Sequence, residues 1–126
     1  LQEPNKIPDY MDCLMPDYTL YPEMDYSMGF TTRGCIRSTC SFCIVNKLEP
    51  HFIEYKDPRV FHHPNHKKIL FLDNNFTASK RFDKTLDYLE EKEVKASFCQ
   101  GLDARLITKE KAERLAEAKL YNLHFG

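Results

Sequence analysis

Apolar and amphipathic stretches alternate along the second half of the chain. Residues 69–72 (Ile-Leu-Phe-Leu) form a short continuous apolar run, which is typical of a strand buried on both faces of a parallel sheet. Phe82, Leu86 and Leu89 then follow at helical spacing, and Ser79 is the expected N-cap of this helix. The pattern therefore predicts a strand, a polar loop and an amphipathic helix in succession.

The same order is repeated further along. Residues 96–100 are predicted to form a strand, and residues 101–106 a turn or short helical piece. Thr108 is expected to cap a second helix, and residues 121–125 to form a last strand. The expected buried face of the second helix is Ala112, Leu115, Ala116 and Lys119 or Leu120. Strands that alternate with helices predict an α/β fold built from right-handed βα units.

The first half of the chain is less regular. Residues 1–26 contain four prolines and four tyrosines, so we expect an extended or turn-rich lead-in before a domain that spans residues 27–126. Residues 27–34 are predicted to form the first strand, and residues 52–55 a short strand. The histidines of residues 62–66 are expected in a solvated loop, because Pro64 makes it hard to aim all three imidazoles at one point.

Polar clusters follow three of the predicted strands. They are the cysteine loop at residues 35–43, the triplet at residues 73–75 and the polar stretch at residues 100–105. In parallel α/β folds the carboxyl ends of the strands form the working face. We therefore expect the three clusters to meet at one edge and to form a metal site with a polar ligand pocket.

Three cysteines lie within nine residues. Cys35, Cys40 and Cys43 are separated by four and then two residues, which is too tight for a packed core and indicates a metal site, with an iron–sulfur cluster or structural zinc as the two main candidates. The total of five cysteines is odd and does not resemble a disulfide framework, so a reducing cytoplasm is the expected setting. Cys99 is expected to be a small core residue, and Cys13 a free thiol.

Length and charge limit the remaining classes of protein. At 126 residues the chain is one domain or less, and both ends look like cuts, so we expect a fragment of a longer protein. The formal net charge is -1 with both signs interspersed, which gives no evidence for nucleic-acid binding. No apolar run approaches the roughly 20 residues needed to cross a bilayer, and no signal-peptide pattern begins the chain.

With these residues assembled, the chain resembles the N-terminal half of a radical S-adenosylmethionine (radical SAM) domain. The resemblance covers residues 17–126 and is most specific at residues 26–43, 69–75 and 100–106. It implies a partial (β/α) barrel related to the TIM barrel, truncated at its C-terminal side. The usual cysteine spacing of the family is CxxxCxxC, whereas this chain has one residue more between Cys35 and Cys40.

The resemblance also implies the site residues. Cys35, Cys40 and Cys43 match the three ligands of a 4Fe–4S cluster. The residues that match contacts to S-adenosylmethionine are Phe42, Asp73, Asn74, Asn75, Gln100, Asp103 and Arg105. The aromatic residue would contact the adenine, residues 73–75 the methionine amino group, and the last three the ribose or carboxylate.

The implied function is that of an enzyme. A radical SAM enzyme cleaves S-adenosylmethionine reductively to a 5′-deoxyadenosyl radical, which takes a hydrogen atom from a substrate, here unidentified. The electron would come from a low-potential donor such as a flavodoxin or ferredoxin. Because half a barrel does not enclose the reaction, this fragment alone is expected to bind a cluster poorly and to turn over nothing.

Two other functions are compatible with the residues. The first is a structural zinc module that uses the three clustered cysteines and a histidine such as His51. The second is a non-catalytic α/β binding domain in which the cysteines are incidental. The clustering of the cysteines argues against the second, and the βα units that follow them argue against the first.

Overall fold

A parallel β-sheet forms the centre of the molecule. The computed structural model describes residues 7–37 and 39–126, and within them four strands lie in the order β1-β4-β5-β6, all parallel. The strands are β1 (Tyr26–Gly29), β4 (Lys68–Phe71), β5 (Lys95–Leu102) and β6 (Leu120–Phe125). The predicted α/β class is therefore confirmed, with β4 and β6 close to their expected bounds and β5 two residues longer at its carboxyl end.

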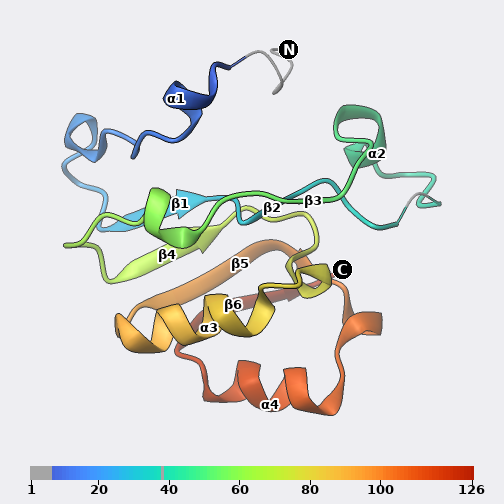
Figure 1. Ribbon diagram of the computed structural model, residues 1–126. Coiled ribbons are helices and arrows are strands. Elements are labelled where there is room, and N and C mark those ends of the chain that lie inside the picture. The colour runs from blue at the N-terminus through green and yellow to red at the C-terminus, as the bar shows by residue number, and fades with distance from the viewer. Residues whose placement is uncertain (1–6, 38) are drawn as a thin grey trace.

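Helices α3 (Phe82–Glu91) and α4 (Lys109–Glu117) connect β4 to β5 and β5 to β6, and both lie on the same side of the sheet (Figure 1). Phe71, Phe76 and Phe98 are stacked beneath them, with ring centroids 4.5 to 5.9 Å apart. All three rings are almost completely buried. This aromatic stack ties the sheet to the loop that follows β4.

Strand β4 was expected to be buried on both faces, but it is fully buried on one. Ile69 and Phe71 point toward the helices and are 1% and 0% exposed, whereas Leu70 on the opposite face is half-buried. The reason is that α3 and α4 cover the same side of the sheet (Figure 1). The lead-in lies beside the free edge of β1, where the Tyr18 hydroxyl accepts from the N–H of Met28 at 3.0 Å.

The predicted single strand at residues 27–34 is wrong, because the chain there divides into two strands. After β1, strand β2 (Thr32–Arg33) leaves the parallel sheet and pairs antiparallel with β3 (Ile53–Glu54). The division has a physical cause. The N–H groups of Thr31 and Thr32 donate to the Asp73 carboxylate and are no longer free for the ladder with β4.

Two details of the helices also differ from expectation. Ser79 is not the N-cap of α3, because that helix begins after Arg81 and the Ser79 hydroxyl donates to Glu54 instead. Thr108 does cap α4, since its hydroxyl accepts from the N–H of Lys111. Leu115 of α4 is buried as predicted, and so is Ala118 just after the helix, while Ala112 and Ala116 are exposed. Of the two alternatives, Lys119 is exposed and Leu120 is partly buried against the core. Leu115 is the one large apolar side chain of α4, so its position decides which face turns inward.

Short elements complete the fold. Helix α1 (Asp9–Asp12) and a 3-10 turn at Tyr18–Leu20 lie in the lead-in, and α2 (Val45–Leu48) follows the cysteine loop. Further 3-10 turns span Pro58–Val60, Phe76–Ala78 and Ala104–Leu106. Of the helices described, none combines the length and apolar character needed to cross a bilayer.

The histidine segment differs from the expected solvated loop. His62 is only 7% exposed, and its ring bonds the Tyr88 hydroxyl and the backbone carbonyl of His66. His66 in turn bonds the hydroxyl of Ser27 in β1. The two imidazoles thus fasten the segment before β4 to β1 and α3, because buried polar rings need hydrogen-bond partners.

Candidate functional site

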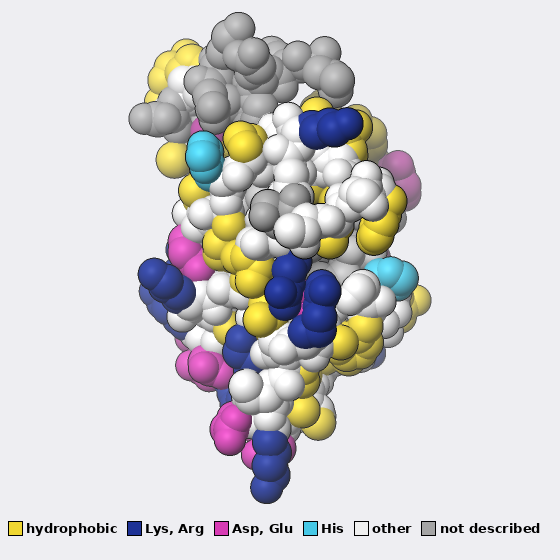
Figure 2. Space-filling model, turned by 90° about the vertical axis from the view of Figure 1, so that its right-hand side faces the viewer, with side chains coloured by type: hydrophobic (Ala, Val, Ile, Leu, Met, Phe, Trp, Pro, Cys, Tyr) yellow, Lys and Arg dark blue, Asp and Glu magenta, His cyan; other side chains and the backbone are white. Residues whose placement is uncertain are grey.

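The loops that follow β1, β4 and β5 meet at the carboxyl edge of the sheet, as predicted (Figure 1). Figure 2 shows the molecule from the side of this edge. Basic side chains lie close together near the middle of this face, with hydrophobic side chains beside them. Three carboxylates from different elements hold the start of the cysteine loop. They are those of Asp73, Glu49 and Asp103.

Asp73 holds the chain just before the loop. Its Oδ1 accepts hydrogen bonds from the N–H and hydroxyl of both Thr31 and Thr32. Its Oδ2 is buried and has no hydrogen-bond partner among the described residues. Burial raises the pKa of Asp73 above its ordinary value, against the opposing effect of these hydrogen bonds. Asp73 was predicted to contact S-adenosylmethionine, but at least one of its oxygens is occupied by the protein itself.

Glu49, at the end of α2, holds the next two residues of the chain. One carboxylate oxygen pairs with the Arg33 guanidinium, and the other accepts from the Gly34 N–H at 2.6 Å and from the Asn74 amide at 3.3 Å. Gly34 has a φ of +72°, and a Cβ there would lie 2.3 Å from the His51 carbonyl oxygen. A glycine is therefore required for the chain to enter the loop in this way.

Asp103, which follows β5, holds the loop itself. Arg37 donates from Nε to Asp103 Oδ2 at 2.7 Å, and Arg105 donates from Nε to Oδ1 at 2.7 Å. The hydrogen bond from Arg105, together with the one from Arg37, holds the pKa of Asp103 well below its ordinary value. Asp103 is therefore a carboxylate whose two oxygens are both engaged by guanidinium groups.

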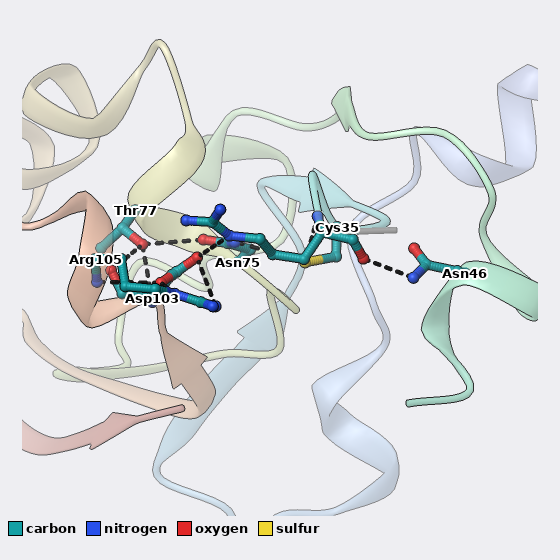
Figure 3. A network of polar contacts seen from close by, with 7 residues as sticks. Cys35, Asn46, Asn75, Thr77, Asp103 and Arg105 are labelled. Carbon is teal, nitrogen blue, oxygen red and sulfur yellow. Dashed lines mark hydrogen bonds and ion pairs between the residues drawn. The ribbon is translucent and has the colours of Figure 1, made fainter. Parts of the chain in front are cut away.

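Cys35 lies beside this group. Its sulfur accepts hydrogen bonds from the backbone N–H of Arg37 at 3.4 Å and from the Asn75 amide at 3.5 Å. Asn75 is 2% exposed, and its Oδ1 accepts from the Thr77 hydroxyl at 3.0 Å. Figure 3 shows Cys35, Asn75, Thr77 and Asp103 joined in one network of polar contacts. The structure thus connects the predicted cysteine, β4 and β5 clusters through hydrogen bonds.

A pocket of about 360 Å³ opens next to the cysteine loop. Its apolar wall comes mainly from residues around α2, and its polar groups come from three elements. The lining residues are Phe30, Ile44, Val45, Leu48, Leu72, Glu49, Asn74 and Gln100. Of the predicted ligand contacts, Asn74 and Gln100 line this cavity. A mainly apolar lining with a few polar groups is typical of small-molecule binding sites.

The other predicted residues are more open. Phe42 is 91% exposed, and Cys40 and Cys43 are half-buried free thiols. Among residues 7–37 and 39–126, no three His, Cys, Asp or Glu side chains are grouped closely enough to hold a metal ion. Cys13 is an exposed free thiol, as expected, and Cys99 is half-buried, with its thiol donating to the Phe71 carbonyl at 3.5 Å.

Several residues that support this site were not predicted from the sequence. The most important are Thr31, Thr32, Arg37, Glu49 and Thr77. Arg37 carried a signal, since it lies inside the cysteine loop. Glu49 carried none, because it lies in an irregular segment and bonds residues 15 and 16 positions earlier. Thr77 lies two residues after Asn75, but its second partner, Asp103, is 26 residues away.

Comparison with known proteins gave no match, whether to a family model, to a curated protein or to a solved structure.

Proposed function

We propose that the chain is part of a radical SAM enzyme, in which Cys35, Cys40 and Cys43 hold a 4Fe–4S cluster. The observation that carries the proposal is the network that joins Cys35 to Asn75 and Asp103 at the carboxyl edge of a parallel sheet. These residues come from the three clusters whose sequences resemble that family. The overall fold proposed for the complete enzyme is a (β/α) barrel, to which the sheet β1-β4-β5-β6 would contribute half.

The donor set fits such a cluster. Thiolates are the ligands that iron–sulfur clusters use, and the three thiols of the loop are unpaired and partly accessible. In the part of the chain that the structure describes, their side chains are not gathered around one point. Metal binding and closure of the loop would therefore be coupled, as is common where ligands come together only around the metal.

The bound cluster and S-adenosylmethionine would supply the reductive cleavage that generates a 5′-deoxyadenosyl radical. The chain itself has more limited tasks. The apolar wall formed by Phe30, Ile44 and Leu48 would exclude water, and the amides of Asn74 and Gln100 would orient a ligand in the pocket. Asp73 and Asp103 would position the loop, since contacts within the protein already engage one oxygen of Asp73 and both oxygens of Asp103.

Iron content tests the proposal. The complete protein that contains this chain is reconstituted anaerobically with iron and sulfide. Its content of iron and sulfide is measured, and its visible spectrum is recorded before and after dithionite. We expect a coloured protein that bleaches on reduction, and loss of the bound iron in Cys→Ala variants at positions 35, 40 and 43. The matched controls are Cys13→Ala and Cys99→Ala, which should keep the iron because neither thiol belongs to the loop.

Addition of S-adenosylmethionine to the reduced sample then tests cofactor binding. Three cysteines leave one iron of a 4Fe–4S cluster without a protein ligand. If S-adenosylmethionine binds this iron, we expect a change in the electron paramagnetic resonance spectrum of the cluster. A colourless chain that binds about one zinc through the same cysteines would instead identify a structural zinc module and overturn the proposal.

A further inference from the structure

Cys35 differs from the other two cysteines of the loop in its surroundings. Its sulfur accepts from two N–H groups, one from the Arg37 backbone and one from the Asn75 side chain. Among residues 7–37 and 39–126, neither Cys40 nor Cys43 has an N–H donor to its sulfur. The protein therefore prepares a position for one thiol of the three.

The contacts around Cys35 form a closed ring. The Asp103 N–H donates to the Thr77 hydroxyl at 3.0 Å, and that hydroxyl donates to Asn75 Oδ1 at 3.0 Å. The Asn75 amide then donates to Cys35 Sγ. On the other side, Arg37 donates from Nε to the Asp103 carboxylate and from its backbone to the same sulfur. Figure 3 shows the part of this ring that runs through Asn75 and Thr77.

Thr77 decides the orientation of the amide. A carboxamide has a donor end and an acceptor end, and because the Thr77 hydroxyl donates to Oδ1, the NH₂ end is left facing the sulfur. Asn75 and Thr77 are 2% and 0% exposed, so water does not compete for these groups. The arrangement is held in place before any ligand arrives.

We propose that Asn75 and Thr77 are positioning residues for Cys35, which makes Cys35 the anchoring ligand of the metal group. This inference rests on the proposed function and deepens it, because it assigns Asn75 to the cysteine sulfur and not to S-adenosylmethionine. Hydrogen bonds to the sulfurs of an iron–sulfur cluster help to set its reduction potential, and they stabilise the more negative, reduced form. The ring thus has two effects: it fixes Cys35, and it raises the reduction potential of a cluster that Cys35 binds.

The first variant is Thr77→Val, with Thr77→Ser as its matched control. Valine keeps the shape of the side chain and removes the hydroxyl, whereas serine retains the hydroxyl. The second variant is Asn75→Leu, which removes the donor to the sulfur directly. Two measurements are made on the full chain: amide hydrogen exchange at Arg37 without metal, and the midpoint potential of the reconstituted cluster.

We expect Thr77→Val and Asn75→Leu each to speed exchange of the Arg37 amide about fivefold, the effect of losing roughly one hydrogen bond's support. Both should also shift the midpoint potential to a lower value, while Thr77→Ser restores wild-type behaviour in both measurements. A purely structural role would not move the potential.

Three results would overturn the inference, and they differ from one another. Unchanged Arg37 exchange in Thr77→Val and Asn75→Leu means that the ring does not position the loop. Faster exchange with an unchanged potential means that the donors do not act on the metal-bound sulfur. If the complete wild-type protein binds no iron, the proposed function itself fails, and the assignment of Cys35 as a ligand fails with it.

Discussion

Asp73 is 2% exposed, and a single one of its carboxylate oxygens serves four donors of Thr31 and Thr32. Its second oxygen is buried without a partner among the described residues. The sequence indicates this side chain as a site residue because it follows a predicted strand. The sequence could not reveal that the partners of Asp73 lie 41 and 42 residues earlier. Nor could it reveal that the hydrogen bonds to Asp73 separate β1 from β2.

Replacement of Asp73 by alanine should lower the free energy of unfolding by about 3 kcal/mol or more, because it leaves buried N–H and O–H groups of two threonines without an acceptor. Asp73→Asn should cost less, since its amide oxygen can still accept. Urea unfolding followed by circular dichroism measures both.

The exposed Asp25 provides the control, and Asp25→Ala should leave the urea midpoint unchanged within error. Equal stability of wild type and Asp73→Ala would show that Asp73 does not hold the loop.

At the scale of elements, the segment between β3 and β4 is fastened by histidine rings. His66 bonds Ser27 of β1, and His62 bonds Tyr88 of α3. The sequence suggested a solvated loop because Pro64 separates the histidines. Pro64 keeps the three rings from sharing one metal ion, but it does not prevent a ring from bonding a separate neighbour.

Acidification should destabilise this segment. Burial lowers the pKa of His66 from its ordinary value of 6.5, and the nearby His63 and His62 lower it further. The unfolded chain therefore takes up a proton at a higher pH than the folded chain does. The stability contributed by His66 is present above the ordinary pKa and is lost as the pH falls through it toward the folded value.

Urea midpoints measured at about pH 7.5 and about pH 5.5 test this effect, since the two values bracket the ordinary histidine pKa. We expect a lower midpoint at the acidic pH, and a smaller difference in His66→Gln. His51→Gln is the control, because His51 is exposed and should leave the pH dependence intact. The same pH dependence in wild type and His66→Gln would contradict the prediction.

At the scale of the whole molecule, one aromatic stack connects the sheet to the site. Phe76 lies in the 3-10 turn that directly follows Asn75, and its ring is 4.5 Å from that of Phe98 in β5. Packing of this ring fixes where the loop after β4 leaves the core. The position of Asn75 therefore depends on the core as well as on its own hydrogen bonds.

Phe76→Ala should lower the free energy of unfolding by about 3–5 kcal/mol, because it removes a fully buried ring from the stack. Phe42→Ala is the matched control: the same substitution at a side chain that is 91% exposed should leave stability almost unchanged. Both are measured by urea unfolding, and similar effects of the two substitutions would contradict this account of the core.

The parallel sheet was predictable because each strand and helix has a local signature. Examples are the apolar run at residues 69–72 and the helical spacing of Phe82, Leu86 and Leu89. Each of these patterns can be recognised from a few neighbouring residues alone. The connections at the carboxyl edge have no such signature. Which carboxylate meets Thr31, Gly34 or Arg37 is decided by packing between distant segments, so only the general location of the site could be predicted.

The ring around Cys35 also sets an order of events during synthesis of the chain. Arg37 and Asp103 are separated by 66 residues, so at a ribosome speed of about 5–20 residues per second the partner is made roughly 3–13 s after the loop. During that interval the cysteines have been made but lack their supporting contacts, and their thiols are open to oxidation. Under the proposed function, delivery of iron and sulfide after translation, to a chain that has already folded, would avoid this exposure.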